Sequence, residues 1–179
     1  MSVTIVVGAQ WGDEGKGKIV DTLAQHANLV IRFNGGNNAG HTIINEFGTF
    51  ALHLIPAGIF NADTLCIIER GVVIHPPSLV DEMKLLEERG ISLKKLLISP
   101  FAHVVMPWHV AEDRGHESGT KIGTTLRGIG PCYQDKVGRW HALRIGDMLD
   151  KTSFIERLET LCRIKRKQFS QEHQKWRKK

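Results

Sequence analysis

Residues 3–18 read Val-Thr-Ile-Val-Val-Gly-Ala-Gln-Trp-Gly-Asp-Glu-Gly-Lys-Gly-Lys, and this stretch decides the fold. Residues 3–7 are a short, β-branched and nearly all-apolar run, typical of a strand buried on both faces of a parallel sheet. The run ends at Gly8, and from Lys16 to about Ala27 apolar residues recur at helical spacing. The stretch therefore predicts a strand, a glycine-rich loop and a helix in direct succession.

The loop between the predicted strand and helix has the composition of a phosphate-binding site. Residues 12–18 match the G-x-x-x-x-G-K part of the P-loop pattern, although Ile19 stands where that pattern has a magnesium-binding Ser or Thr. Glycines let backbone N–H groups converge on phosphate oxygens, and the helix N-terminus adds partial positive charge. Lys16 and Lys18 would neutralise phosphate. We therefore expect a nucleoside phosphate as ligand; the structural alternative is a glycine-rich turn with solvated lysines.

Asp13 distinguishes this loop from a site that only binds phosphate. A carboxylate among phosphate-binding amides weakens anion binding unless it holds a metal or accepts a proton, and both uses indicate chemistry. Its presence inside the loop, together with Ile19, argues against a generic P-loop ATPase.

A second glycine-rich loop follows the next predicted strand, residues 29–33. It covers residues 34–41, Asn-Gly-Gly-Asn-Asn-Ala-Gly-His. We expect it at the same carboxyl edge of the sheet as the first loop, where open α/β sheets bind ligands. Asn38 offers a donor and an acceptor for a base or a phosphate. A lone histidine is more often structural, but the company of His41 favours a general acid or a charge stabiliser.

Strands and helices alternate along the rest of the first half. The pattern predicts a hairpin over residues 42–54, strands at 65–68, 71–74 and 96–99, and a helix from Pro76 to a C-cap at Gly90. On that helix the expected buried positions are Leu79, Val80, Met83, Leu85 and Leu86, and the expected exposed positions are Glu82, Lys84, Glu87, Glu88 and Arg89. The predicted class is α/β, a mostly parallel central sheet flanked by helices, similar to P-loop NTPases, with glycine-rich active-site loops.

The second half is divided between an irregular stretch and a helix. Residues 113–146 lose all periodicity and are rich in glycine, which is typical of a functional loop or of disorder. Residues 153–156 fit a capping box, and apolar positions at helical spacing follow. We expect a nucleotide-binding domain over residues 1–150 and a basic amphipathic helix over 151–179, which would begin a further portion.

The net charge of +5 belongs to the end of the chain. Residues 163–179 hold eight Lys or Arg against Glu172, and subtracting that +7 from +5 leaves −2 for residues 1–162. This tail could bind nucleic acid or an anionic surface, but no aromatic platform or nucleic-acid motif accompanies it, so solvated lysines on a packed helix are the preferred interpretation.

Cysteine usage and hydropathy indicate the compartment. Cys66, Cys132 and Cys162 are far apart and odd in number, which favours a reducing environment. The apolar run at residues 3–7 has no basic leader, and no run approaches ~18 apolar residues. The sequence predicts a cytoplasmic protein without a membrane partner.

The two glycine-rich loops together closely resemble those of adenylosuccinate synthetases. The resemblance covers residues 3–150 almost continuously. The motifs that carry it are residues 10–21, 35–42, 52–58, 71–73 and 122–131, Tyr133, and residues 135–137 and 143–147.

The resemblance implies an activity. The family ligates L-aspartate to inosine monophosphate (IMP) with GTP and Mg²⁺, a step of purine biosynthesis: the 6-oxygen of IMP is phosphorylated and then displaced by the aspartate amine. By resemblance, Asp13 takes the purine-ring proton and coordinates Mg²⁺ with the carbonyl of Gly40. Lys16 and His41 complete the catalytic group, and His41 steadies the transferred phosphoryl group.

The resemblance also assigns binding residues. Those for GTP are Gly12, Asp13, Glu14, Gly15, Lys16, Gly17, Lys18, Gly40, His41 and Thr42. Those for IMP are Asp13, Glu14, Gly15, Lys16, Asn38, Ala39, Gly40, His41, Thr125 and Arg139. Thr125 matches the contact to the IMP phosphate. Arg139 matches an arginine that reaches IMP from the other subunit, so a homodimer is implied.

The sequence departs from the family pattern in several places. Leu126 stands where glycine is expected, residues 140–142 differ, and Glu69-Arg70 replace small polar residues. The family's later motifs for guanine and aspartate are absent. We therefore expect a fragment of a longer ligase, and the alternative is a truncated regulatory relative that binds GTP or IMP without ligation.

Overall fold

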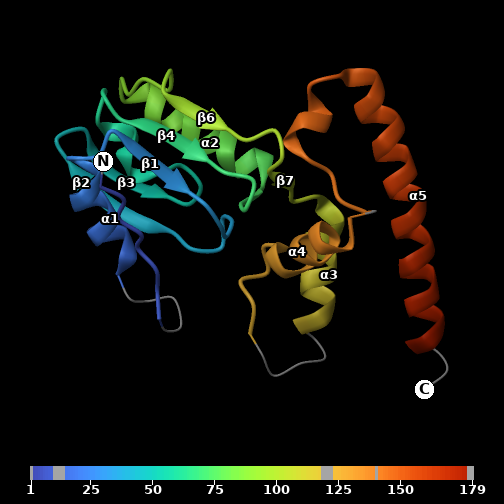
Figure 1. The fold of residues 1–179 in the computed structure, drawn as a ribbon. Helices are drawn as coiled ribbons and strands as arrows, with labels where there is room; N and C mark the ends of the chain where they lie inside the picture. Colours follow the sequence, from blue (N-terminus) through green and yellow to red (C-terminus); the bar gives the residue numbers. More distant parts are fainter. Residues whose placement is uncertain (1, 10–14, 118–122, 140, 177–179) are drawn as a thin grey trace.

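The computed structural model describes residues 2–9, 15–117, 123–139 and 141–176. Its centre is a parallel three-stranded sheet in the order β1-β4-β6. Figure 1 shows this sheet and α2 in one half of the molecule, and α3, α4 and α5 in the other. The α/β class with a parallel sheet and helices is confirmed.

In chain order the elements are α1 (Lys16–Ala24), β1 (Leu29–Arg32), β2 (His41–Asn45), β3 (Gly48–Leu52), η1 (Ala57–Phe60), β4 (Leu65–Ile68), β5 (Val73–Ile74), α2 (Pro76–Glu88), β6 (Leu96–Ile98), β7 (His103–Val104), α3 (Pro107–Glu117), α4 (Ile129–Gly138), η2 (Ile145–Met148) and α5 (Lys151–Trp176).

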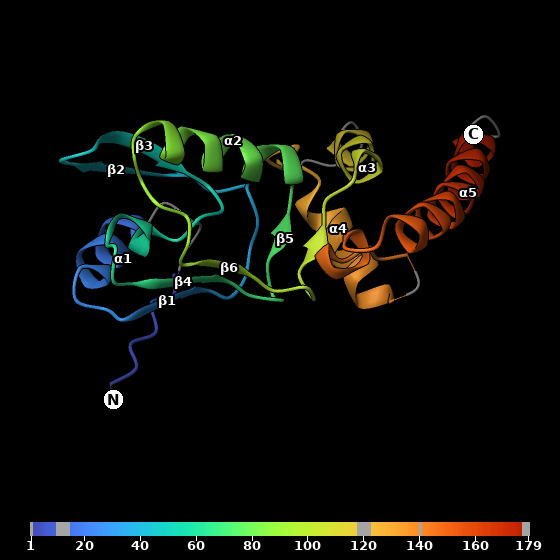
Figure 2. The same cartoon turned by 90° about the horizontal axis from the view of Figure 1, so that it is seen from above.

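The two faces of the central sheet differ in their cover. Cys66 and Ile68 of β4 point into the main core and are fully buried. Figure 2 shows α2 and the β2-β3 hairpin on one side of the sheet. The alternate residues Leu29, Ile31 and Leu97 remain 45–49 % exposed, and the register aligns Ile31 with Leu97 through β4. One face of the parallel sheet is therefore bare apolar surface.

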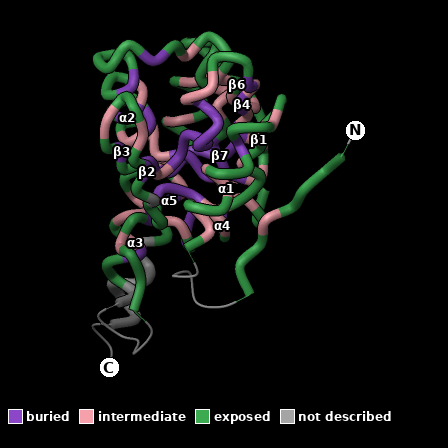
Figure 3. Tube along the Cα trace, turned by 90° about the vertical axis from the view of Figure 1, so that its left-hand side faces the viewer, coloured by how far each residue is buried: buried purple, intermediate pink, exposed green. Residues whose placement is uncertain are grey.

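The strand predicted at residues 3–7 does not form in the described structure. Val3, Ile5 and Val7 are 85 %, 71 % and 69 % exposed, and none of the described strands pairs with this segment. Figure 3 shows it running outward from the sheet. A strand needs a neighbour for its N–H and C=O groups as well as an apolar sequence. The prediction of a buried first strand is therefore wrong for this structure.

Helix α2 begins where the two prolines predict and is followed by Gly90 at φ +78°, as a C-terminal glycine requires. The predicted distribution of its side chains is partly wrong. Val80 and Leu85 are 45 % and 36 % exposed, whereas Glu82 is only 6 % exposed. The Glu82 carboxylate is buried because it accepts backbone hydrogen bonds, and periodicity does not reveal such bonds.

The stretch predicted to be irregular, residues 113–146, contains helix α4, the end of α3 and the start of the short η2. Gly128 and Gly138 stand at the two ends of α4. Gly128 begins α4 at φ +73°, and a Cβ there would meet the backbone carbon of His109 at 2.8 Å. The Gly128 N–H donates to Asp113 Oδ2 at 2.8 Å. Gly128 therefore lets the start of α4 pack closely against α3. The prediction that residues 113–146 are irregular is wrong for the part that forms α3, α4 and η2.

Helix α5 begins earlier than predicted. Asp150 Oδ1 accepts from the Ser153 N–H at 2.8 Å, so Asp150 is the capping residue in place of Ser153.

Lys165 on α5 is 5 % exposed and does not belong to the solvated lysines. Its Nζ donates at 2.9 Å to Asp135 on α4 and to Glu112 on α3. His109 Nδ1 accepts from the Met106 N–H, so Nε2 carries the proton that it donates to Asp135 at 2.9 Å. This ionic cluster of His109, Glu112, Asp135 and Lys165 joins three helices.

Among the described helices, none is long and apolar enough to cross a lipid bilayer.

Candidate functional site

The structure describes the first glycine-rich loop at Gly8 and Ala9 and again from Gly15, where α1 begins. Gly15 precedes the helix in the left-handed region at φ +76°, and no side chain caps the helix N-terminus. Lys16, Gly17 and Lys18 form the first turn, and the Lys18 N–H donates to the Gly15 carbonyl at 3.1 Å. A helix N-terminus without a side-chain cap is suited to an anion. The predicted residues Gly12, Asp13 and Glu14 lie outside the described residues.

The second glycine-rich loop follows β1, as predicted, and three side chains hold its backbone. Arg32 Nη2 donates to the Gly36 carbonyl at 2.7 Å, and Arg127 Nη1 donates to the Asn37 carbonyl at 2.5 Å. The Tyr133 hydroxyl accepts from the Gly35 N–H at 2.8 Å. The loop is therefore fixed by residues up to 98 positions away along the chain.

Close packing explains one glycine in this loop. A Cβ at Gly36 would lie 2.6 Å from Ile129 Cδ1 and 2.9 Å from the Val73 carbonyl oxygen, so only glycine lets the loop pass between β5 and α4.

A polar chain runs beneath the loop from Asn37, which is 4 % exposed. Its Nδ2 donates to Ser78 Oγ at 3.0 Å, and Ser78 Oγ lies 2.8 Å from His75 Nδ1. Burial, followed by the nearby Arg127 charge, lowers the pKa of His75, so its ring is neutral near pH 7. Asn37 Oδ1 is buried without a partner among the described residues.

The sequence pattern singled out Asn38, which is exposed, and missed Asn37. Arg32, Arg127 and Tyr133 were missed as supports of the loop, because nothing in local spacing links them to it. The family-like motif at residues 122–131 was the one available signal for Arg127.

The predicted residues of the second loop lie at its exposed end. Asn38, Ala39 and Gly40 are exposed, and Ala39 O lies 3.3 Å from His53 Nδ1. The backbone of His41 and Thr42 begins β2. Helix α1 packs against β2, so the helix that follows the first loop lies beside the strand that follows the second.

Thr125 lies in an exposed turn that Arg127 connects to the second glycine-rich loop. The turn places Leu126 at φ +55°, a conformation that favours glycine, and Thr124 Oγ1 accepts from the Leu126 N–H at 3.2 Å. Arg127, two residues after Thr125, bonds to the second glycine loop. Arg139 directly follows α4 and is exposed, at φ +64°. No described hydrogen bond connects Arg139 to either glycine loop.

Helix α1, which follows a left-handed glycine and has no side-chain cap, and the braced second loop are typical of α/β proteins that bind anionic ligands at a helix N-terminus. The family model for adenylosuccinate synthetase matches residues 5–178. The chain therefore belongs to the adenylosuccinate synthetase family.

Relatives agree with the family model. The adenylosuccinate synthetase of Exiguobacterium sibiricum is 50 % identical over 173 residues, covering 95 % of this chain and 40 % of the relative. That of Heliobacterium modesticaldum is 56 % identical over 162 residues, covering 89 % and 38 %. A solved structure of fully ligated adenylosuccinate synthetase from Plasmodium falciparum aligns with a TM-score of 0.79 at 38 % identity, covering 91 % of this chain and 39 % of that one. The chain thus spans about 40 % of the length of its curated relatives.

Proposed function

We propose that this chain supplies the phosphate- and IMP-binding part of a GTP-dependent ligase that joins L-aspartate to IMP. The observation that carries the proposal is the family match over residues 5–178, which includes both glycine-rich loops. The products would be adenylosuccinate, GDP and phosphate.

The first turn of α1 would receive the GTP phosphates. Its N-terminus has no side-chain cap, and Lys16 and Lys18 bring two positive charges to the turn. Backbone N–H groups and lysine charges are the usual means of stabilising a transferring phosphoryl group. We include Gly12 to Lys18 and Gly40 to Thr42 in this GTP site.

Asp13 and the backbone carbonyl of Gly40 would hold Mg²⁺. Both supply oxygen ligands, which Mg²⁺ prefers, and Gly40 is exposed at the start of β2. The ion would supply neutralisation of phosphate charge.

The proposed chemistry is assigned to side chains of the two loops. Asp13 would take the proton from N1 of the purine as the 6-oxygen of IMP attacks the γ-phosphorus and GDP leaves. His41 and Lys16 would stabilise charge on the phosphoryl group in transfer. The aspartate amine would then attack C6, and phosphate would leave with the 6-oxygen.

IMP would lie against the exposed end of the second loop and the turn at Thr125. Asn38 to His41 would face the base, and Thr125 would bind the 5′-phosphate. The Arg127 bond to the Asn37 carbonyl supports this placement, because it ties the two segments together. Arg139, exposed at the end of α4, would reach the IMP of a second subunit in a homodimer. Recognition of guanine and aspartate would fall to the part of the fold that the relatives carry beyond this match.

The test is turnover. With IMP, GTP, Mg²⁺ and L-aspartate supplied, the full protein that carries this chain should form adenylosuccinate, followed by its absorbance. Asp13→Asn should reduce kcat at least about a hundredfold, the contribution of a general base, with a small change in IMP affinity. Asp63→Asn, an exposed aspartate remote from both loops, is the matched control. Full activity of Asp13→Asn would refute the base assignment, and binding of GTP and IMP without turnover would favour the regulatory alternative.

A further inference from the structure

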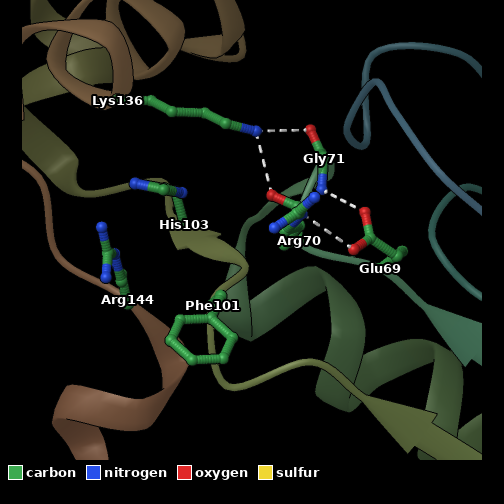
Figure 4. Close-up of a pocket in the computed structure, with 7 residues that line it drawn as sticks. All are labelled: Glu69, Arg70, Gly71, Phe101, His103, Lys136 and Arg144. Atoms are coloured by element: carbon green, nitrogen blue, oxygen red, sulfur yellow. Dashed lines mark hydrogen bonds and ion pairs between the residues drawn. The ribbon is translucent and has the colours of Figure 1, made fainter.

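We propose that a second pocket, outside both glycine-rich loops, binds a small oxyanion such as a phosphate or a dicarboxylate. The pocket has a volume of about 340 Å³ and lies between the loop after β4, strand β7 and helix α4 (Figure 4). None of its lining residues belongs to the GTP or IMP sites proposed above, so it is a separate site.

Positive charge reaches this pocket from three different elements. Arg70 follows β4, Lys136 lies on α4, and Arg144 precedes η2. Glu69 is the one carboxylate among the lining residues, and its oxygens are already engaged with Arg70 at 3.3 Å and with the Gly71 N–H at 2.9 Å. Three cations against one carboxylate give a formal charge of +2, which favours an anion of matching charge.

Lys136 is held in place at the pocket wall. Its Nζ donates to the carbonyls of Arg70 and Gly71 at 2.9 and 2.8 Å (Figure 4). An ammonium group has three donors, so these two bonds fix the charge and leave one donor for a ligand. The guanidinium of Arg144 lies 5.9 Å from the Phe101 ring, which lines the pocket beside it.

His103 supplies the observation that points to a ligand. It is 7 % exposed, and its Nδ1 is buried without a hydrogen-bond partner among the described residues. Figure 4 shows the His103 ring at the pocket between Lys136 and Arg144, and a β-bridge places His103 directly opposite Arg144. A buried polar atom without a partner is costly, and an oxyanion in this pocket would provide the missing acceptor.

Burial and the charged groups around His103 together keep its ring neutral. Burial, then the charges of Lys136 and Arg144, lower the pKa of His103 to about 4, while Asp147 acts in the opposite direction. The ring is therefore neutral near pH 7 and can donate a hydrogen bond from one nitrogen. Asp147 is itself occupied, because its Oδ2 accepts from the Arg144 N–H at 2.8 Å and pairs with Arg157 at 3.4 Å. It does not neutralise the pocket.

The experiment follows the His103 ring by two-dimensional NMR, with its signals assigned through His103→Gln. The full protein that carries this chain is titrated separately with inorganic phosphate and with L-aspartate. We expect saturable shifts of the His103 signals, weakened about tenfold by Arg70→Gln and by Arg144→Gln, since each removes one charge-assisted contact. Arg89→Gln, an exposed arginine after α2, carries the same charge change and should leave the midpoint unaltered.

The two titrations separate the sources of the anion, since a stronger response to phosphate identifies a phosphoryl ligand and a stronger response to aspartate a dicarboxylate. Absence of saturable His103 shifts with both compounds would overturn the proposal. Equal titration midpoints for the Arg70→Gln and Arg89→Gln variants would also overturn it. The Arg70 side chain is 76 % exposed, so its replacement should leave the fold intact. Phosphate binding at α1 is distinguished because it shifts the amides of residues 15–18 and leaves His103 unchanged.

Discussion

At the residue scale, one carboxylate holds the segment that follows β3. Glu82 accepts hydrogen bonds at 3.0 Å from the backbone N–H groups of His53, Leu54 and Ile55. Leu54 and Ile55 are fully buried in the main core, so water does not replace this acceptor. The same segment continues from the β2-β3 hairpin, and His53 contacts the second glycine-rich loop through Ala39. Glu82 therefore supports the candidate site indirectly.

Glu82→Ala should lower the free energy of unfolding by about 3 kcal/mol, because buried N–H groups lose a charged acceptor. Urea denaturation followed by circular dichroism measures the change. Glu87→Ala, on the exposed side of the same helix, is the control and should change stability by less than about 0.5 kcal/mol. Equal effects of the two substitutions would show that the Glu82 bonds contribute no stability.

The sequence predicted the conformation of single residues correctly where that conformation depends on neighbours along the chain. Gly90 was predicted as a C-cap and has the left-handed conformation that the cap needs. Leu126, noted as replacing an expected glycine, has φ +55°. Glu82 was assigned to solvent because its partners, the N–H groups of residues 53–55, are distant in sequence, and the same distance hid the pairing of Lys165 with Asp135. Long-range hydrogen bonds of this kind have no periodicity to detect.

At the element scale, the ionic cluster of His109, Glu112, Asp135 and Lys165 fixes α5 to α3 and α4. Lys165→Met removes the shared cation and leaves two carboxylates at the helix junction. We expect a loss of about 3 kcal/mol in the free energy of unfolding, since removing one partner of a buried pair is strongly destabilising. Lys167→Met, at an exposed position on the same helix, is the control and should be nearly neutral. Matching denaturation midpoints would contradict the proposed role of the cluster.

The cluster also predicts how stability depends on pH. Burial would raise the pKa of Asp135, but hydrogen bonds from His109 and Lys165 outweigh it and lower the pKa below its usual value. The Asp135 contribution is therefore present above about pH 4 and is lost as the pH falls through the lowered pKa. Unfolding measured between about pH 2 and 6 should show a steeper acid decline in the native chain than in Lys165→Met. Parallel profiles would contradict this prediction.

Helices and strands were likewise predicted where nearby residues determine them and missed where distant contacts do. The β2-β3 hairpin, β4 and α2 were predicted because alternation, turn residues and prolines act within a few positions. Helix α4 was missed because glycines at both its ends made the stretch look irregular. Residues 3–7 have the composition of a strand, but pairing depends on a neighbour that composition does not supply.

At the scale of the whole molecule, the β1-β4-β6 sheet is covered on one face. Parallel sheets are almost always covered on both. The bare face presents Leu29, Ile31 and Leu97, and large exposed apolar patches promote association. The chain also spans about 40 % of its curated relatives, and their remaining length is the proposed source of guanine and aspartate recognition.

Studied as a separate polypeptide, this chain should self-associate through the bare face. Ile31→Lys should reduce that association, because a charge opposes burial of the face. Val137→Lys, 79 % exposed on α4 and outside the sheet, is the control and should have little effect. Sedimentation velocity measures the association. Equal reduction by both substitutions would show that added charge alone, irrespective of the sheet face, is responsible.

We propose that the two glycine-rich loops form one nucleotide site, and IMP titration followed through backbone amide NMR signals tests this proposal most directly. With GDP and Mg²⁺ present, IMP should shift the amides of residues 15–18 and 38–42 with one shared midpoint, while amides of α5 stay unchanged. Shifts confined to one loop, or different midpoints for the two, would contradict the claim.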